Sequence, residues 1–177
     1  MINKNYLLFL LFIYIIFILL FLLIYLYETI DYYKFMRTLE DDGYKVLRDF
    51  HKPSILNELP ENYEFIDYKF KVKGCAVSTF HRDVTSSQSI FKTKYPVYTC
   101  ITYKNNGNLL AICPASHKTT PFLFERPLII NGREGTTIIF NCDIIHSGAI
   151  NEFGENREAI QYKICHKEDK DKLKHLI

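Results

Sequence analysis

Hydrophobic residues are distributed unevenly along the chain, and the N-terminal stretch differs sharply from the rest. The segment from Tyr6 to Tyr27 reads YLLFLLFIYIIFILLFLLIYLY and contains no charged residue, glycine or proline. As a helix it would be about 33 Å long, which is enough to cross the hydrocarbon core of a bilayer. Tyrosines at both ends suit the interfacial region of a membrane. We therefore predict a single-pass transmembrane anchor within residues 1–29.

The pattern after this segment is that of a helix followed by a short strand. Phe35 and Leu39 recur at helical spacing, and Gly43 is suited to end a helix. The stretch YKVLRDF, residues 44–50, then alternates apolar and polar positions as a strand does. Residues 30–59 are predicted as a helical lead-in with a first strand.

From residue 60 onward, short apolar runs alternate with polar turns. The runs are rich in Val, Ile, Thr, Tyr and Phe and include YPVYTCITY, LLAIC, TTIIF and REAIQYKIC, with turns such as KNNGN and NGREG between them. Many short strands joined by turns indicate a sandwich or barrel, not alternating βαβ units. We predict one mainly β domain over residues 60–170, followed by a tail at 171–177.

Composition and charge narrow the class of protein. The formal net charge is +2, from 22 basic and 20 acidic residues, so we expect no nucleic acid as a partner. The five cysteines form no CxxC pair and are odd in number, which argues against a disulfide framework and against a zinc ribbon. Basic residues after the hydrophobic segment weakly favour a cytoplasmic domain, but acidic neighbours offset them. The side of the membrane therefore stays open.

The candidate chemistry begins at FHRDVT, residues 80–85, where His81 and Asp83 lie two positions apart. On a strand they would point to one face, either as a polar pair or as two metal ligands. His146 follows the run TTIIF, and Arg157 comes eleven residues later. Two imidazoles and one carboxylate around an ion leave positions open for substrate and O₂, as in non-haem Fe(II) oxygenases. Arg157 would offer a planar fork to the far carboxylate of a co-substrate such as 2-oxoglutarate.

Spacing alone leaves both interpretations open, but the surrounding sequence resembles the phytanoyl-CoA dioxygenase-like branch of the Fe(II)/2-oxoglutarate oxygenases. The similarity covers about residues 35–165 and occurs in the family's order, in LEDDGYKVLRDF, FHRD, NNGNLLAICPASHK and EGTTIIFNCDIIHSGAINEFGENREAI. It implies a double-stranded β-helix (jelly-roll) and a hydroxylase that uses Fe(II), 2-oxoglutarate and O₂ and releases succinate and CO₂. It also implies that His81, Asp83 and His146 bind the iron and that Arg157 binds 2-oxoglutarate.

A second stretch, YTCITYKNN, is similar to the strand that follows HxD in prolyl hydroxylases. That similarity implies that Thr99 and Tyr103 line the co-substrate pocket and hydrogen-bond the same carboxylate as Arg157. The alternative is that both are ordinary strand residues. The chain departs from the phytanoyl-CoA dioxygenase-like pattern at Ala115, where the family has glycine, but none of the differences removes a ligand.

Several alternatives remain at this point. The chain could be a prolyl hydroxylase-type enzyme acting on a protein, a non-catalytic membrane-tethered jelly-roll binding module, or a cupin-like metal protein without 2-oxoglutarate. Asp143 could compete as a ligand, whereas His117 is expected in a structural turn, and residues 84–96 are expected to form a lid. The substrate, whether a small molecule, a lipid or a protein, is not indicated by the sequence.

Overall fold

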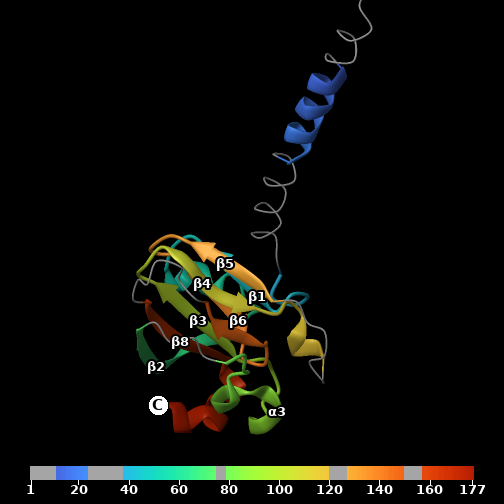
Figure 1. Cartoon of the computed structure of the whole chain (residues 1–177). Helices are drawn as coiled ribbons and strands as arrows, with labels where there is room; N and C mark the ends of the chain where they lie inside the picture. Colours follow the sequence, from blue (N-terminus) through green and yellow to red (C-terminus); the bar gives the residue numbers. More distant parts are fainter. Residues whose placement is uncertain (1–10, 24–37, 75–78, 120–126, 150–156) are drawn as a thin grey trace, which may run out of the picture. The chain divides into compact units, whose positions relative to one another are not determined.

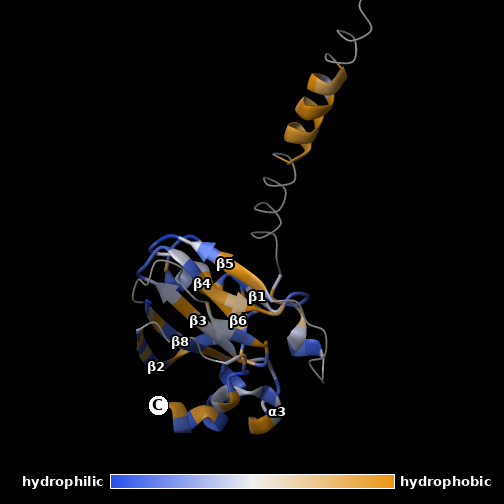
Figure 2. Ribbon diagram, viewed as in Figure 1, coloured by the Kyte–Doolittle hydropathy of each residue, from blue (hydrophilic) through white to orange (hydrophobic). Residues whose placement is uncertain are grey.

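The computed structural model describes residues 11–23, 38–74, 79–119, 127–149 and 157–177. The chain divides into two compact units, Met1–Met36 and Arg37–Ile177. In the first unit, residues 11–23 form a helix that is apolar throughout, as the hydropathy colours of Figure 2 show, and its side chains are all exposed. Among the described residues, no helix is both long enough and apolar enough to cross a membrane. The remainder of the predicted anchor, residues 6–10 and 24–27, lies outside the described residues.

The described residues of the second unit form eight antiparallel-paired strands in two sheets, and Figure 1 shows their arrangement. The larger sheet has the order β1-β6-β3-β8-β2, and the smaller has the order β5-β4-β7. This confirms the prediction of a mainly β domain. The strands are β1 (Tyr44–Leu47), β2 (Tyr63–Lys73), β3 (Tyr98–Tyr103), β4 (Gly107–Ile112), β5 (Leu128–Gly132), β6 (Thr137–Asn141), β7 (His146–Gly148) and β8 (Glu158–His166).

Within the described ranges of this unit, few helical elements accompany the sheets. They are α2 (Lys52–Leu56), α3 (Gln88–Phe91) and three 3-10 segments, η1 (Val84–Ser86), η2 (Ser116–Lys118) and η3 (Lys167–Leu176). The predicted lid, residues 84–96, thus contains η1 and α3. The end of the chain, predicted as a tail from residue 171, instead belongs to η3, which buries Leu173 completely.

The main core lies between the two sheets. It combines Ile101, Ile138 and Phe140 from the larger sheet with Leu110 and Ile112 from the smaller. Fully burying an aliphatic or aromatic side chain of this size contributes about 1.5–3 kcal/mol. Two-residue alternation sends every second side chain of β3 and β6 into this core.

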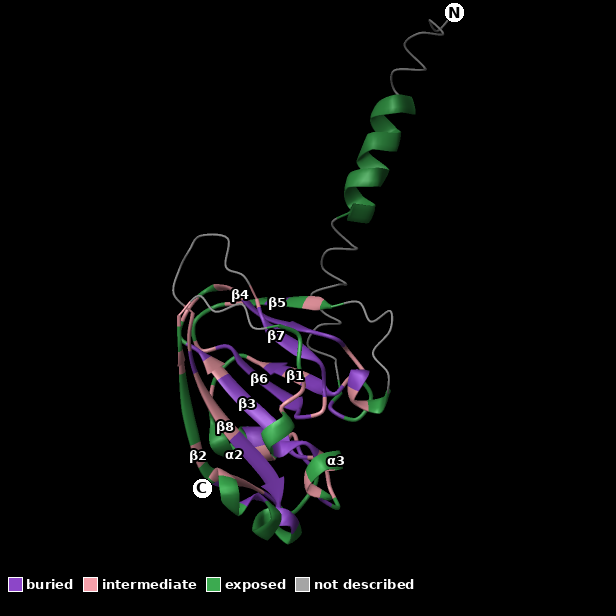
Figure 3. Ribbon diagram, turned by 60° about the horizontal axis from the view of Figure 1, so that its bottom comes forward, coloured by how far each residue is buried: buried purple, intermediate pink, exposed green. Residues whose placement is uncertain are grey.

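The opposite face of the larger sheet is also covered. Cys100, Ile139 and Ile164 pack there with Ile55 of α2 and with Leu59. β3 and β6 are therefore buried on both faces, as Figure 3 shows, whereas β2 is exposed mainly in its second half. Burial on both faces explains why TTIIF reads as a continuous apolar run instead of an alternating one.

The lead-in differs from its prediction. The described residues 38–43 form turns, and the rest of the predicted helix lies outside the described residues. Gly43 has a φ of +80°, and a Cβ at this position would lie 2.4 Å from Nδ1 of His117. Gly43 is therefore required by its positive φ and by close packing against His117. The first strand is shorter than expected and covers Tyr44–Leu47.

Asp169 provides a test of how η3 is held on the domain. Its buried carboxylate accepts hydrogen bonds from the backbone N–H groups of Lys94 and Tyr95, at 2.9 and 2.8 Å, and from Lys172 at 2.9 Å. We expect Asp169→Ala to lower the free energy of unfolding by about 2 kcal/mol, because two backbone donors lose a charged acceptor. Urea denaturation followed by circular dichroism would measure this loss.

The same carboxylate sets a pH dependence. Burial favours a higher pKa for Asp169, but its hydrogen bonds outweigh that effect and lower the pKa below its ordinary value. Its stabilisation is therefore complete above the ordinary carboxyl pKa of about 3.9 and is lost as the pH falls below it. Asp171→Ala, at an exposed carboxylate, is the matched control. An equal loss of stability in both variants would contradict the role of Asp169 in holding η3 on the domain.

Candidate metal centre

A backbone bridge places the two candidate histidine ligands side by side. The N–H of His81 donates to the carbonyl of His146 at 2.9 Å, and the N–H of His146 donates back at 3.0 Å. The two imidazole centroids are consequently 4.5 Å apart. His81 lies in this isolated bridge, and Asp83 directly precedes η1, so the predicted HxD strand is not formed.

Asp83 reaches the same point by a different route. Its N–H donates to the carbonyl of Cys142 at 2.9 Å, which fixes the backbone beside the end of β6. Its Oδ1 lies 4.0 Å from Nε2 of His81 and 3.7 Å from Nε2 of His146. The three candidate ligand atoms lie within 4.8 Å of one another. The structure thus brings together all three residues that the sequence analysis selected as ligands.

The hydrogen bonds of the two rings suit metal binding. Nδ1 of His81 lies 2.8 Å from the carbonyl oxygen of Thr79, and Nδ1 of His146 lies 3.0 Å from that of Ile144. A carbonyl oxygen only accepts, so each Nδ1 must carry the proton, and in the neutral ring Nε2 keeps its lone pair. Metal-binding histidines are oriented by bonds of this kind. The donor set therefore fits a divalent transition-metal ion with two nitrogens and one oxygen.

Electrostatics keep these groups in the protonation states that a metal needs. Burial favours a higher pKa for Asp83, but the Lys163 ammonium, His146 and a hydrogen bond from Thr99 together lower it below its usual value. Burial also lowers the pKa of His146, which favours the neutral imidazole, although Asp83 partly opposes this. The ligand set is consequently one carboxylate with a neutral His146.

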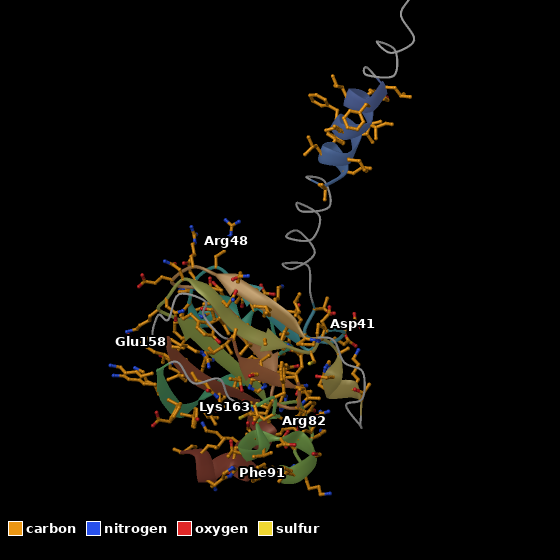
Figure 4. All side chains as sticks on the ribbon, viewed as in Figure 1. Asp41, Arg48, Arg82, Phe91, Glu158 and Lys163 are labelled. Atoms are coloured by element: carbon orange, nitrogen blue, oxygen red, sulfur yellow. The ribbon has the colours of Figure 1, made fainter. Side chains whose placement is uncertain are left out.

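Lys163 was missed by the sequence analysis. Its ammonium, on a side chain only 1% exposed, lies 2.6 Å from Oδ2 of Asp83. Figure 4 shows Lys163 within the domain, whereas Arg48 reaches outward. Lys163 lies six residues after Arg157, an even spacing that puts both on one face of a strand. A lysine with the same parity as Arg157 along REAIQYKIC was the available signal.

Arg157 and Tyr103 form the other end of the site. Arg157 donates from Nη2 to the Tyr103 hydroxyl at 3.1 Å, and the guanidinium carbon lies 5.4 Å from the centroid of the phenol ring. Burial raises the pKa of Tyr103, although Arg157 opposes this shift, so the phenol stays protonated. Nε of Arg157 is buried and has no hydrogen-bond partner within the described part of the chain. The guanidinium therefore has a donor left for an anion.

A cavity joins the ligand group to Arg157, and Tyr103, which contacts Arg157, is not among the residues that line it. It has a volume of about 230 Å³, and both Arg157 and the three candidate ligands line it. Its other lining residues are mostly apolar: Val72, Ile101, Leu110, Phe140, Gly148 and Gln161. A larger cavity of about 680 Å³, lined partly by Tyr63, Tyr98 and His166, contains none of the ligands. The smaller cavity carries the chemistry because charged and metal-binding groups converge in it.

The remaining candidates lie elsewhere. Thr99 donates to Oδ2 of Asp83 at 2.5 Å, so it lies at the ligand end of the site and apart from the Tyr103–Arg157 pair. Asp143 accepts hydrogen bonds from Ser87 and the backbone of Gln88, which engages both of its oxygens. His117 lies in the η2 turn and contacts the carbonyl of Glu40, which is consistent with a structural role.

Comparison with solved structures finds a similar fold in several enzymes. The chain matches SnoK, an alpha-ketoglutarate-dependent carbocyclase from nogalamycin biosynthesis, with a TM-score of 0.55 at 9% identity, over 73% of this chain and 82% of that one. HygX from Streptomyces hygroscopicus, with nickel and 2-oxoglutarate bound, gives 0.50 at 10% identity over 73% and 84%. The epimerase SnoN, in complex with Fe³⁺, alpha-ketoglutarate and nogalamycin RO, gives 0.51 at 10% identity over 72% and 80%.

The likeness is one of fold. No protein-family profile and no curated protein sequence matches the chain. The chain spans only 29% of EvdMO1, another matching structure, which aligns with 62% of this chain at 13% identity. The fold and the His–Asp–His group therefore define a two-sheet β domain with a potential metal centre, of the architecture seen in non-haem alpha-ketoglutarate-dependent enzymes.

The metal centre can be tested directly. We expect His146→Ala to weaken Co²⁺ binding by at least a hundredfold in anaerobic titration calorimetry, because one of only two nitrogen ligands is lost. His117→Ala, which removes a partly buried histidine outside the ligand group, should bind Co²⁺ like the wild type. Unchanged binding in His146→Ala would exclude the site.

Proposed function

We propose that this protein is an Fe(II)- and 2-oxoglutarate-dependent dioxygenase that hydroxylates its substrate and releases succinate and CO₂. The observation that carries the proposal is one cavity with a His81–Asp83–His146 ligand group and the partly unpaired guanidinium of Arg157. When bound, the metal would supply activation of O₂, and the protein contributes orientation and exclusion of water. The ordered sequence similarities support the phytanoyl-CoA dioxygenase-like branch in particular.

The cavity suits the co-substrate. At about 230 Å³ it is smaller than the 300–1,000 Å³ of common ligand pockets, and it suits a five-carbon dicarboxylic acid. Arg157 would bind the distal carboxylate, with the Tyr103 hydroxyl as a second donor, while the 2-oxo end points toward the ligand group. Thr99 would act on Asp83 and not on the co-substrate.

The route for the substrate follows from exposure. The His81 side chain is 43% exposed, whereas those of Asp83 and His146 are 14% and 8% exposed. The ligand group is therefore open on the side of His81, where Phe80 is also exposed. A substrate too large for the cavity would approach from this side. This geometry suits a small molecule, a lipid or a protein side chain.

Attachment to a membrane is a further part of the proposal. It rests on the uncharged stretch from Tyr6 to Tyr27 and on the exposed apolar face of the helix over residues 11–23. A membrane-bound enzyme would meet lipids or membrane proteins at high local concentration.

Turnover tests the reaction class. The 177-residue chain, purified in mild detergent, should convert 2-oxoglutarate to succinate when Fe(II), ascorbate and O₂ are present. Without the substrate this uncoupled reaction is slow, and mass spectrometry would detect the succinate. Asp83→Ala should abolish the conversion. Equal conversion in the variant and the wild type would refute the proposed function.

Arg157 tests co-substrate recognition separately from the metal. We expect Arg157→Gln to raise the KM for 2-oxoglutarate by about 10- to 100-fold, which is the usual range for losing a hydrogen bond to a charged group. Co²⁺ affinity without 2-oxoglutarate should stay within about threefold of the wild type, because Arg157 is not in the ligand group. Arg133→Gln, at an exposed arginine, is the control. An unchanged KM for 2-oxoglutarate in Arg157→Gln would show that Arg157 does not bind the co-substrate.

A further inference from the structure

A buried hydrogen-bond network surrounds the ammonium of Lys163. Its Nζ lies 2.6 Å from Oδ2 of Asp83, 2.7 Å from the Thr99 hydroxyl and 2.9 Å from the Ser86 hydroxyl. An ammonium has three donors, and these three oxygens satisfy all of them. Cys142 completes the surroundings, with its Sγ 3.5 Å from Nζ. The network is therefore fully paired even though Lys163 is almost inaccessible to solvent.

The cost of this arrangement suggests that it serves the site. Burying a lysine removes a strongly hydrated charge from water, and an ion pair often does not repay that cost relative to apolar residues. If an apolar side chain filled the space of Lys163, no ammonium would need hydrogen-bond partners there. Stability alone therefore gives a weak reason for a lysine at this position.

The two oxygens of Asp83 have different partners as a result. Oδ2 receives hydrogen bonds from both Lys163 and Thr99, at 2.6 and 2.5 Å. Oδ1 instead faces the imidazoles, 3.7 Å from His146 and 4.0 Å from His81. With Oδ2 occupied by two donors, Asp83 can offer a metal only Oδ1.

Charge adds a second effect. In the part of the chain that the structure describes, Asp83 is the one carboxylate that forms an ion pair with Lys163. The ammonium thus offsets the only negative charge in the ligand group, which reduces the attraction of that group for a divalent cation. An anionic chelator would bring the missing negative charge with it.

We propose that Lys163 is a positioning residue that holds Asp83 as a single-oxygen ligand and thereby keeps a coordination position free for a 2-oxo acid. The inference rests on the proposed function and extends it. If Lys163 acts in this way, the protein alone binds the metal weakly. A tight complex then requires the 2-oxo acid as well. Without Lys163, Oδ2 would keep only the hydrogen bond from Thr99, and it could then bind the metal at a position that the co-substrate needs.

The test compares Lys163→Met with the wild type in the 177-residue chain. Methionine has a similar length but neither a charge nor a strong donor. We expect Co²⁺ affinity without 2-oxoglutarate to rise about tenfold, and 2-oxoglutarate affinity for the Co²⁺-loaded protein to fall about tenfold. These changes are within the range typical of coupling between two sites. Anaerobic titration calorimetry measures both constants without turnover, and the Co²⁺ absorption spectrum reports the altered coordination.

Controls separate this effect from general damage. Lys104→Met removes a half-exposed lysine that pairs with Glu158 and should change neither affinity. Thr99→Val removes the second donor to Oδ2 and should shift both affinities in the same direction by a smaller factor. If Lys163→Met does not fold, Thr99→Val decides, and unchanged affinities in it overturn the proposal.

The outcomes also distinguish the two proposals. If the wild type binds no Co²⁺, as is expected of the Asp83→Ala variant, the proposed function and this inference are both overturned. A wild type that binds Co²⁺ and 2-oxoglutarate, together with a folded Lys163→Met variant of equal or weaker Co²⁺ affinity, would overturn the role of Lys163 alone.

Discussion

Two reciprocal backbone hydrogen bonds join His81 to His146, and the candidate site depends on them. They attach the segment before η1 to the first residue of β7, so residues 65 positions apart in sequence present their imidazoles side by side. β7 is itself paired with β4 in the smaller sheet. The position of the exposed His81 ring is thus fixed by the same ladder that builds the core, and Asp83 follows because its N–H is bound to Cys142.

Strand β8 contributes the second half of the site through its alternation. Gln161 and Lys163 lie on it at odd positions, and Arg157 directly precedes it with the same parity. Arg157 therefore lines the cavity and contacts Tyr103, and Lys163 contacts Asp83. Because β8 lies between β2 and β3, both of its edges are paired, and its register cannot slip without breaking two ladders.

Local patterns were sufficient for part of this picture. The β class was predictable because short strands and turns are written in contiguous sequence. The three candidate ligands and Arg157 were selected from the resemblance of the motifs around them to the Fe(II)/2-oxoglutarate oxygenases, because spacing alone left the polar-pair interpretation open. Three features were not predictable. The HxD pair lies outside a regular strand, since its backbone pairs only with residues distant in sequence. Thr99 lies at Asp83 because the β3–β8 register sets it opposite Lys163, and sequence does not specify register. The parity of Lys163 with Arg157 is visible in the sequence, but its contact with Asp83 follows only from that pairing.

The edge of the larger sheet at β2 carries one further consequence. Lys69, Lys71 and Lys73 follow one another along this edge strand, and all three are exposed. If a second copy laid its own β2 alongside in antiparallel fashion, lysines would meet lysines, and like charges across a strand pair are destabilising. Such charges on an edge strand are a common protection against sheet extension between chains. The exposed lysines of β2 therefore oppose edge-to-edge association of this sheet with a second copy.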